Sequence, residues 1–176
     1  MESTKSKKLK NLIIDVDGVL TDGQFHYTAE GKVAKIFGPD DHDALLLLKP
    51  HLNIVMITGD KKGWPITHKR VAEDMKFPLH LVSTVERIDW MTKHFDLKET
   101  IYVGDGIFDA MVFQEVGYAI APANAFFKVK ELASYVTAAK GGEGAMAEAC
   151  WHLMEIMGLN PDIRHLTGLQ GGEWGK

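Results

Sequence analysis

The chain has 176 residues, a length that suits one domain with a substantial buried core. Hydrophobic residues make up 45% and charged residues 25%, which is the balance of a globular protein rather than a disordered one. The formal net charge of −4 at pH 7 gives no general attraction to nucleic acid or to an anionic membrane. The basic run within residues 5–10 is interpreted as a solvated terminus, not as a nucleic-acid arm.

In chain order, we expect a first strand at 12–16, followed by a β-hairpin at 24–27 and 32–37. Helices and strands then alternate: a helix at 41–49, a strand at 53–58, a helix at 66–75, a strand at 79–82 and a helix at 85–95. The alternation continues with a strand at 100–103, a helix at 109–116, a strand at 118–121, a helix at 125–133, a strand at 135–137 and a helix at 144–157. This alternation indicates a doubly wound, Rossmann-like parallel α/β sheet with no separate cap domain. We expect a flexible N-terminus at 1–9, one folded domain at 10–158 and a Gly-rich tail at 159–176.

The single cysteine, Cys150, excludes a disulfide within the chain and is typical of a reducing compartment. The first ten residues are polar and show no signal-peptide pattern. No stretch approaches the roughly 20 apolar residues that span a bilayer. We therefore expect a cytoplasmic protein that does not bind membranes.

Polar turns follow three of the expected strands, at residues 15–18, 58–59 and 104–109. The carboxyl ends of parallel strands meet at one edge of a sheet, so Asp15, Asp17, Asp105 and Asp109 are expected to converge. Carboxylates packed together resist ionisation unless a cation neutralises them, and an oxygen-only site suits Mg²⁺. The alternative, that each Asp merely caps a helix, accounts for one such turn better than for three together.

These turns resemble the motifs of the haloacid dehalogenase superfamily, over about residues 10–158. The superfamily's Asp-x-Asp-Gly-x-x-Thr motif stands here as Asp15-Val16-Asp17-Gly18-Val19-Leu20-Thr21. Its strand-end hydroxyl residue matches Thr58, and its later Gly-Asp pair with a following Asp matches Gly104-Asp105 and Asp109. The resemblance implies a Mg²⁺-dependent phosphoric monoester hydrolase that works through an aspartyl-phosphate.

The resemblance also assigns roles to individual residues. It makes Asp15 the nucleophile and Asp17 the general acid and base. It implies that Mg²⁺ is bound by the side chains of Asp15 and Asp105 and by the backbone carbonyl of Asp17. It implies phosphate binding by Thr58 and by the backbone at Gly59.

Two further residues, Asp109 and Arg87, stand beside this set. Asp109 is expected to support the site from nearby. The superfamily's third motif, a Lys that begins the helix before the Gly-Asp strand, is missing. Arg87 is the candidate replacement as a phosphate-binding cation, and a solvent-facing arginine on that helix is the alternative.

Residues 15–23 and the stretch Gly141-Gly142-Glu143-Gly144-Ala145 look like one branch of the superfamily. That branch contains 3-deoxy-D-manno-octulosonate 8-phosphate phosphatase and the phosphatase-like domain of acylneuraminate cytidylyltransferases. It implies a sugar or acid-sugar phosphate substrate and a homotetramer in which hairpins associate and a neighbour's tail helps close the site. The tail at residues 168–175 fits that closing role or plain disorder equally well.

Three acids stand where the branch has arginine, namely Asp40, Asp60 and Glu143. Arginine binds a carboxylate bidentately, whereas an acid repels it. We therefore expect a neutral or amino-bearing sugar phosphate in place of a carboxylate-bearing one.

Two other functions are consistent with these motifs. A non-catalytic, tetramer-forming module is the first alternative, and a phosphotransferase or phosphomutase with the same intermediate is the second. A nucleotide-binding dehydrogenase is excluded, since it requires Gly-x-Gly-x-x-Gly after the first strand, where this chain has an Asp-rich turn.

Overall fold

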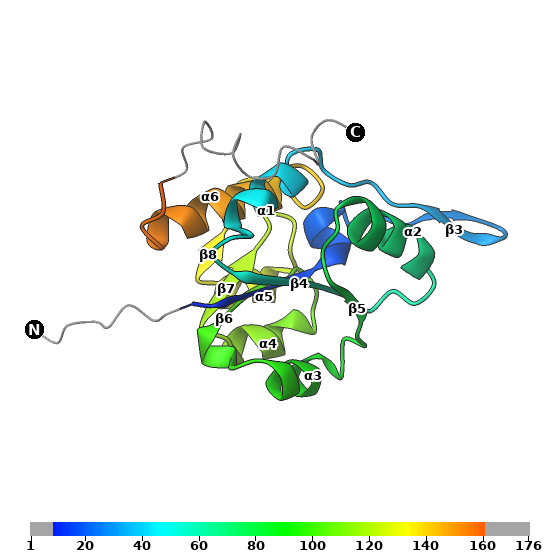
Figure 1. Ribbon diagram of the computed structural model, residues 1–176. Helices are drawn as coiled ribbons and strands as arrows, with labels where there is room; N and C mark the ends of the chain where they lie inside the picture. The colour runs from blue at the N-terminus through cyan, green and yellow to red at the C-terminus, as the bar shows by residue number, and fades with distance from the viewer. Residues whose placement is uncertain (1–8, 161–176) are drawn as a thin grey trace, which may run out of the picture.

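A six-stranded sheet forms the centre of the computed structural model, which describes residues 9–160 (Figure 1). The strand order is β5-β4-β1-β6-β7-β8, and every neighbouring pair is parallel. The strands are β1 (Asn11–Asp15), β4 (Asn53–Thr58), β5 (Leu79–Leu81), β6 (Thr100–Val103), β7 (Tyr118–Ala121) and β8 (Tyr135–Val136). Central strands such as β1 and β6 are apolar along nearly their whole length because both faces of the sheet are covered.

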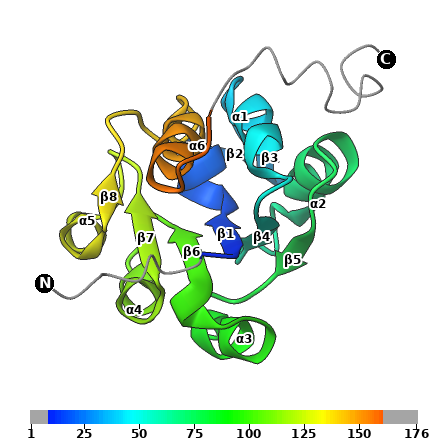
Figure 2. The ribbon, with the colours of Figure 1, turned by 60° about the vertical axis from the view of Figure 1, so that its left-hand side comes forward.

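Helices cover both faces of this sheet, as Figure 2 shows. One face carries α1 (Asp41–Leu48), α2 (Trp64–His68) with its continuation η2 (Lys69–Asp74), and α6 (Ala145–Ile156). The other carries α3 (Arg87–His94), α4 (Asp109–Glu115) and α5 (Phe127–Leu132), with the short turn η3 (Leu97–Glu99) before β6. The predicted doubly wound α/β fold is confirmed.

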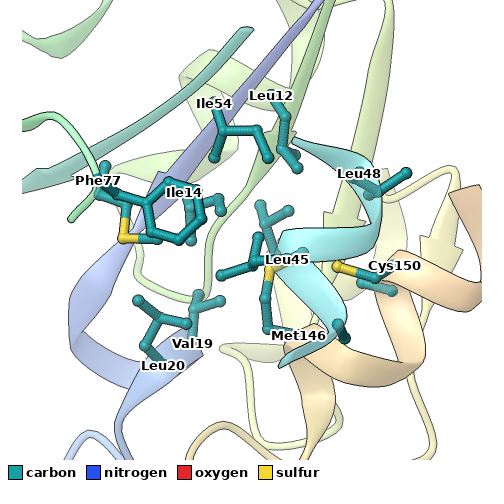
Figure 3. Close-up of a cluster of buried hydrophobic side chains, with 14 of the residues drawn as sticks. Leu12, Ile14, Val19, Leu20, Leu45, Leu48, Ile54, Phe77, Met146 and Cys150 are labelled. Carbon is teal, nitrogen blue, oxygen red and sulfur yellow. The ribbon is translucent and has the colours of Figure 1, made fainter. Parts of the chain in front are cut away.

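Each face has its own hydrophobic core. The core under α1 and α6 packs Leu45 and Cys150 against sheet residues such as Ile14 (Figure 3). Cys150 is fully buried there and packs as part of the core. The core on the opposite face contains Ile13 and Met91. The alternation of Ile13 and Ile14 between the two cores follows from the two-residue period of a strand.

A two-stranded hairpin, β2 (His26–Thr28) and β3 (Gly31–Ala34), projects from the body of the protein (Figure 1). It is shorter than the sequence predicted, because beyond Ala34 only a single bridge, Thr21 to Phe37, continues the pairing. Gly31 has φ +123°, a conformation that favours glycine, and it begins the returning strand.

The chain reverses direction across the sheet at its centre. From β1 it passes to β4 and β5 on one side, and then to β6, β7 and β8 on the other. The loops that leave β1 and β6 therefore diverge to opposite faces of the sheet, and sheets of this kind bind ligands near the carboxyl ends of the strands at such a point.

Several helix boundaries differ from the prediction by one or two residues, and two of these differences have a visible cause. The α2 helix begins at Trp64 rather than residue 66, with Pro65 in its first turn, where a missing N–H costs nothing. The α5 helix begins at Phe127 rather than residue 125, because the Phe126 N–H donates to the Asp105 carbonyl (2.8 Å) and residue 126 is not helical.

The predicted terminal segments lie almost wholly outside the described residues, and so does the proposed closing tail at 168–175. Within residues 9–160, none of the helices has the length and apolar character that crossing a membrane requires.

Candidate active site

The acidic residues predicted to converge do meet at the carboxyl edge of the sheet. Carboxylate oxygens of Asp15, Asp105 and Asp109 lie within 4.8 Å of one another. The Thr58 hydroxyl, at the end of β4, donates to Asp17 Oδ2 at 2.7 Å. The strand ends of β1, β4 and β6 therefore bring all five side chains into one site.

The turn after β1 (η1, Val16–Leu20) owes its shape to a glycine and a threonine. The backbone leaves helical geometry at Asp17 and Gly18, and Gly18 has φ +86°. The Thr21 hydroxyl accepts hydrogen bonds from the N–H groups of Gly18 (3.1 Å) and Gly23 (3.3 Å). Thr21 is 2% exposed and thus holds the turn rather than facing a ligand.

Arg87 lies at the start of α3 and is buried, with 1% of its surface exposed. Its Nη1 donates to Asp15 Oδ2 at 2.7 Å and to Asp109 Oδ1 at 2.5 Å. Its Nε and Nη2 are buried and have no hydrogen-bond partner within the described part of the chain. The alternative of a solvent-facing arginine is wrong, and these two nitrogens, which carry three N–H donors, have no acceptor within the described residues.

Asp109 uses both of its oxygens within the protein. Oδ1 accepts hydrogen bonds from Arg87 and from the Tyr102 hydroxyl (2.7 Å). Oδ2 accepts from the backbone N–H groups of Asp105 (2.9 Å) and Gly106 (2.8 Å). Asp109 therefore shapes the loop that carries Asp105 and is poorly placed to bind a metal itself.

Sequence reasoning missed Tyr102. Its hydroxyl is fully buried between Arg87 (2.7 Å) and Asp109. The signal was faint, because a tyrosine inside an apolar strand is also an ordinary core residue.

Burial and like charge make the acids of this site hard to ionise. Burial raises the pKa of Asp15 well above its usual value, against the lowering effect of Arg87, and the neighbouring Asp109 and Asp105 raise it further. Burial, followed by repulsion from Asp109 and Asp17, raises the pKa of Asp105 to about 7. Burial lowers the pKa of Arg87, but interactions with Tyr102, Asp15 and Asp109 raise it by more. Arg87 therefore stays protonated.

Two lysines of the hairpin reach the site, and sequence reasoning missed both. Lys35 Nζ lies 2.6 Å from Asp17 Oδ1 and 2.8 Å from Asp60 Oδ2. Lys32 also pairs with Asp60, and the lysine side chains are 1% and 3% exposed. Burial alone would raise the pKa of Asp60, but hydrogen bonds from Lys32 and Lys35 and from the Gly63 N–H lower it to about 2.

The charges gathered here favour a divalent cation. Within the described residues, the network contains five acids and three cations, so it carries an excess of two negative charges when all are ionised. The acids are Asp15, Asp17, Asp60, Asp105 and Asp109, and the cations are Lys32, Lys35 and Arg87. A hard, oxygen-only donor set with that excess charge fits Mg²⁺.

A pocket of about 280 Å³ opens over this network. Its lining residues are Asp15, Asp17, Phe25, Gly59, Asp60, Thr84 and Arg87. Of the three acids at arginine positions, Asp60 lines the pocket, whereas Asp40 and Glu143 are exposed and do not. The pocket thus joins the predicted nucleophile to the predicted phosphate-binding turn.

Comparison with known proteins agrees with this geometry. A family model described as haloacid dehalogenase-like hydrolase matches residues 85–148. The 3-deoxy-D-manno-octulosonate 8-phosphate phosphatase KdsC of Haemophilus influenzae is 32% identical over 163 residues, which cover 88% of this chain and 87% of that protein.

Solved structures show the same likeness. A probable YrbI family phosphatase from Pseudomonas syringae has a TM-score of 0.78 and 30% identity, covering 94% of this chain and 96% of its own. A 3-deoxy-D-manno-octulosonate 8-phosphate phosphatase from Moraxella catarrhalis, solved with magnesium, phosphate and KDO, has a TM-score of 0.76, 26% identity and the same coverage. The chain therefore belongs to the 3-deoxy-D-manno-octulosonate 8-phosphate phosphatase family of haloacid dehalogenase-like hydrolases.

Proposed function

We propose that the protein is a Mg²⁺-dependent phosphatase that hydrolyses a sugar phosphate monoester through a phosphorylated Asp15. The observation that carries this proposal is the placement of Asp15. Its Oδ2 is held by Arg87 at 2.7 Å, so the carboxylate is fixed at a pocket that also contains Asp17 and Gly59. A fixed carboxylate beside a general acid is the arrangement that covalent phosphoryl transfer requires.

In the first half-reaction, an Asp15 oxygen attacks phosphorus while the bond from phosphorus to the sugar oxygen breaks. Asp17 gives its proton to that leaving oxygen, so the sugar departs as a neutral alcohol. Asp15 then carries the phosphoryl group. The free Nε and Nη2 of Arg87, with the backbone at Gly59, are the groups that can hold the phosphoryl oxygens. The Thr58 hydroxyl donates its hydrogen bond to Asp17 and therefore holds Asp17 instead.

In the second half-reaction, water attacks phosphorus and passes a proton to the Asp17 carboxylate. The bond between phosphorus and Asp15 breaks, which yields inorganic phosphate, restores the Asp15 carboxylate and reprotonates Asp17. Asp15 and Asp105 are the side chains that would hold Mg²⁺, together with the Asp17 carbonyl, and the ion when bound would offset charge on the transferring group.

We further propose that the sugar is neutral or amino-bearing. Asp60 lines the pocket with an ionised carboxylate, and both lysines near it are already paired. A substrate carboxylate would meet Asp60 without a free cation among the lining residues apart from the deep Arg87. Hydroxyl or ammonium groups can instead donate to Asp60.

The experiment is a phosphate-release assay with and without Mg²⁺ on three substrates: 3-deoxy-D-manno-octulosonate 8-phosphate, glucose 6-phosphate and glucosamine 6-phosphate. We expect Mg²⁺-dependent release, lost in Asp15→Asn, with the neutral and amino sugars preferred. Absence of release from every substrate would favour the non-catalytic module, whereas preference for the octulosonate would refute the proposed sugar class alone.

We also propose a homotetramer. The hairpin and the residues that flank it expose several large apolar side chains, namely Phe25, Tyr27, Val33 and Ile36. Exposed apolar side chains gathered on one projecting element are typical of an association surface. Light scattering of the wild type and of Tyr27→Glu should show a tetramer and a smaller species, respectively.

We propose a cytoplasmic location on the basis of the single, buried Cys150, because a chain without disulfides suits a reducing compartment. Cell fractionation of the tagged protein tests this.

A further inference from the structure

Lys35 has an environment unusual for a lysine. It follows directly after β3, and its neighbour Ile36 is 49% exposed, yet the Lys35 side chain is 1% exposed. Its Nζ lies 2.6 Å from Asp17 Oδ1, 2.8 Å from Asp60 Oδ2 and 2.8 Å from Thr67 Oγ1. An ammonium group has three N–H donors, so all of them have an acceptor.

Asp17 is consequently held from two sides by two separate parts of the chain. Lys35, from the hairpin, contacts Oδ1, and Thr58, from the end of β4, donates to Oδ2 at 2.7 Å. Hydrogen bonds to both oxygens fix the plane and the rotation of the carboxyl group. General acid catalysis depends on this orientation, since the proton must point at the leaving oxygen.

The second partner of Lys35 makes this arrangement compatible with proton transfer. In the proposed reaction, Asp17 alternates between a neutral and an ionised form. A buried ammonium group left without a counter-charge would be costly. Asp60 also lies beside Lys35, and Lys32 and the Gly63 N–H hold Asp60 in place, so its carboxylate supplies a counter-charge that does not depend on Asp17. Lys35 can therefore keep its position throughout the reaction.

We propose that Lys35 is a positioning residue that orients the carboxyl group of Asp17 toward the leaving oxygen. This inference rests on the proposed phosphatase function. The step that it serves is the break of the bond between phosphorus and the sugar oxygen, as the O–H bond of Asp17 breaks and a new O–H bond forms on the alcohol. The hairpin thus contributes to catalysis as well as to association.

The test compares two substrates that differ in their need for a proton. A sugar phosphate such as glucosamine 6-phosphate loses a poor leaving group that must be protonated, whereas 4-nitrophenolate leaves without a proton. The value of kcat/KM reports on steps up to departure of the leaving group. For Lys35→Met we expect a loss of about 10- to 100-fold with the sugar phosphate and under about 3-fold with 4-nitrophenyl phosphate.

Three further variants make the result decisive. Lys62→Met replaces an exposed lysine two residues after Asp60, and its kcat/KM with both substrates should match that of the wild type. Lys35→Arg keeps the charge and should recover part of the loss. Thr67→Val removes one acceptor of Lys35 and should give a smaller loss with the same dependence on the leaving group. It carries the test if Lys35→Met does not fold, as judged by circular dichroism.

Equal losses with both substrates, or no loss, would overturn the role of Lys35 while leaving the phosphatase proposal intact. A wild type that releases no phosphate from any substrate would instead overturn the function on which this inference rests.

Discussion

The space that a side chain on Gly18 would occupy is taken by the carboxylate of Asp105. A Cβ atom placed on Gly18 would lie 2.0 Å from Asp105 Oδ2, far inside van der Waals contact. Gly18 also has φ +86°, where residues with a side chain are strained. The glycine of the first motif thus lets the loop after β6 bring its acid beside Asp15.

Gly18→Ala should therefore abolish Mg²⁺ binding and Mg²⁺-dependent activity, because Asp105 must move away. Isothermal titration calorimetry with Mg²⁺ measures this directly. Gly158→Ala is the matched control, because Gly158 also has positive φ (+67°) but a Cβ there meets nothing within 4 Å. Both variants carry a strain of about 1–2 kcal/mol, so unchanged Mg²⁺ affinity in Gly18→Ala would show that the steric argument is incorrect.

Replacing Arg87 should destabilise the protein strongly. Arg87→Met leaves the buried Asp15 and Asp109 without their shared counter-charge, and we expect a loss of about 3–5 kcal/mol in the free energy of unfolding. Urea denaturation without metal measures it. Lys93→Met, an exposed position on the same helix, should change stability by under about 0.5 kcal/mol. A comparable stability for both variants would contradict the ion-pair network.

Mg²⁺ should raise the melting temperature of the wild type. A ligand that binds the native state stabilises it by about 2.7 kcal/mol at a hundredfold excess over Kd. Asp105→Asn should lose this shift, and in the absence of metal it should melt above the wild type because a buried acid repelled by Asp109 and Asp17 has been neutralised. A full Mg²⁺ shift in Asp105→Asn would rule out Asp105 as a ligand.

Asp41, which is not among the residues that line the pocket, makes stability depend on pH. Burial raises the pKa of this carboxyl to about 6, against a hydrogen bond from the Ala147 N–H (3.0 Å). Because the folded pKa lies above the unfolded value of 3.8, the contribution of Asp41 to stability is full below about pH 4 and is lost as pH rises through 6.

Asp41→Asn keeps the acceptor for Ala147 but cannot ionise. Its stability relative to the wild type should rise between pH 4 and pH 6, by up to about 3 kcal/mol, and then stay level. Urea midpoints across this pH range provide the measurement. A difference between the two proteins that does not vary with pH would contradict the role of Asp41.

The central strands and the acidic turns could be predicted from the sequence because each is a local signal. Ile13 and Ile14 mark a strand covered on both faces, and the motif that begins at Asp15 sits directly after it. Parallel strands share an edge, so the convergence of Asp15 with Asp105 followed from topology alone.

The two lysines of the site, and the burial of Arg87, could not be predicted in the same way. Lys35 follows a hairpin strand, and nothing local distinguishes it from a solvated lysine; its burial depends on Asp17, Asp60 and Thr67, which are 18, 25 and 32 positions away in the sequence. The burial of Arg87 likewise depends on β1 and α4. A count of acids against cations around the motifs was the available hint, since so many buried carboxylates require nearby positive charge.

The most direct test of the account is to find where the phosphoryl group goes. The wild type is mixed with Mg²⁺ and a hydrolysed sugar phosphate, quenched with acid within its first turnover, digested and analysed by mass spectrometry. The account predicts one phosphoryl group on Asp15, absent in Asp15→Asn and in reactions without Mg²⁺. Phosphate release at the normal rate with Asp15 unmodified throughout would contradict it.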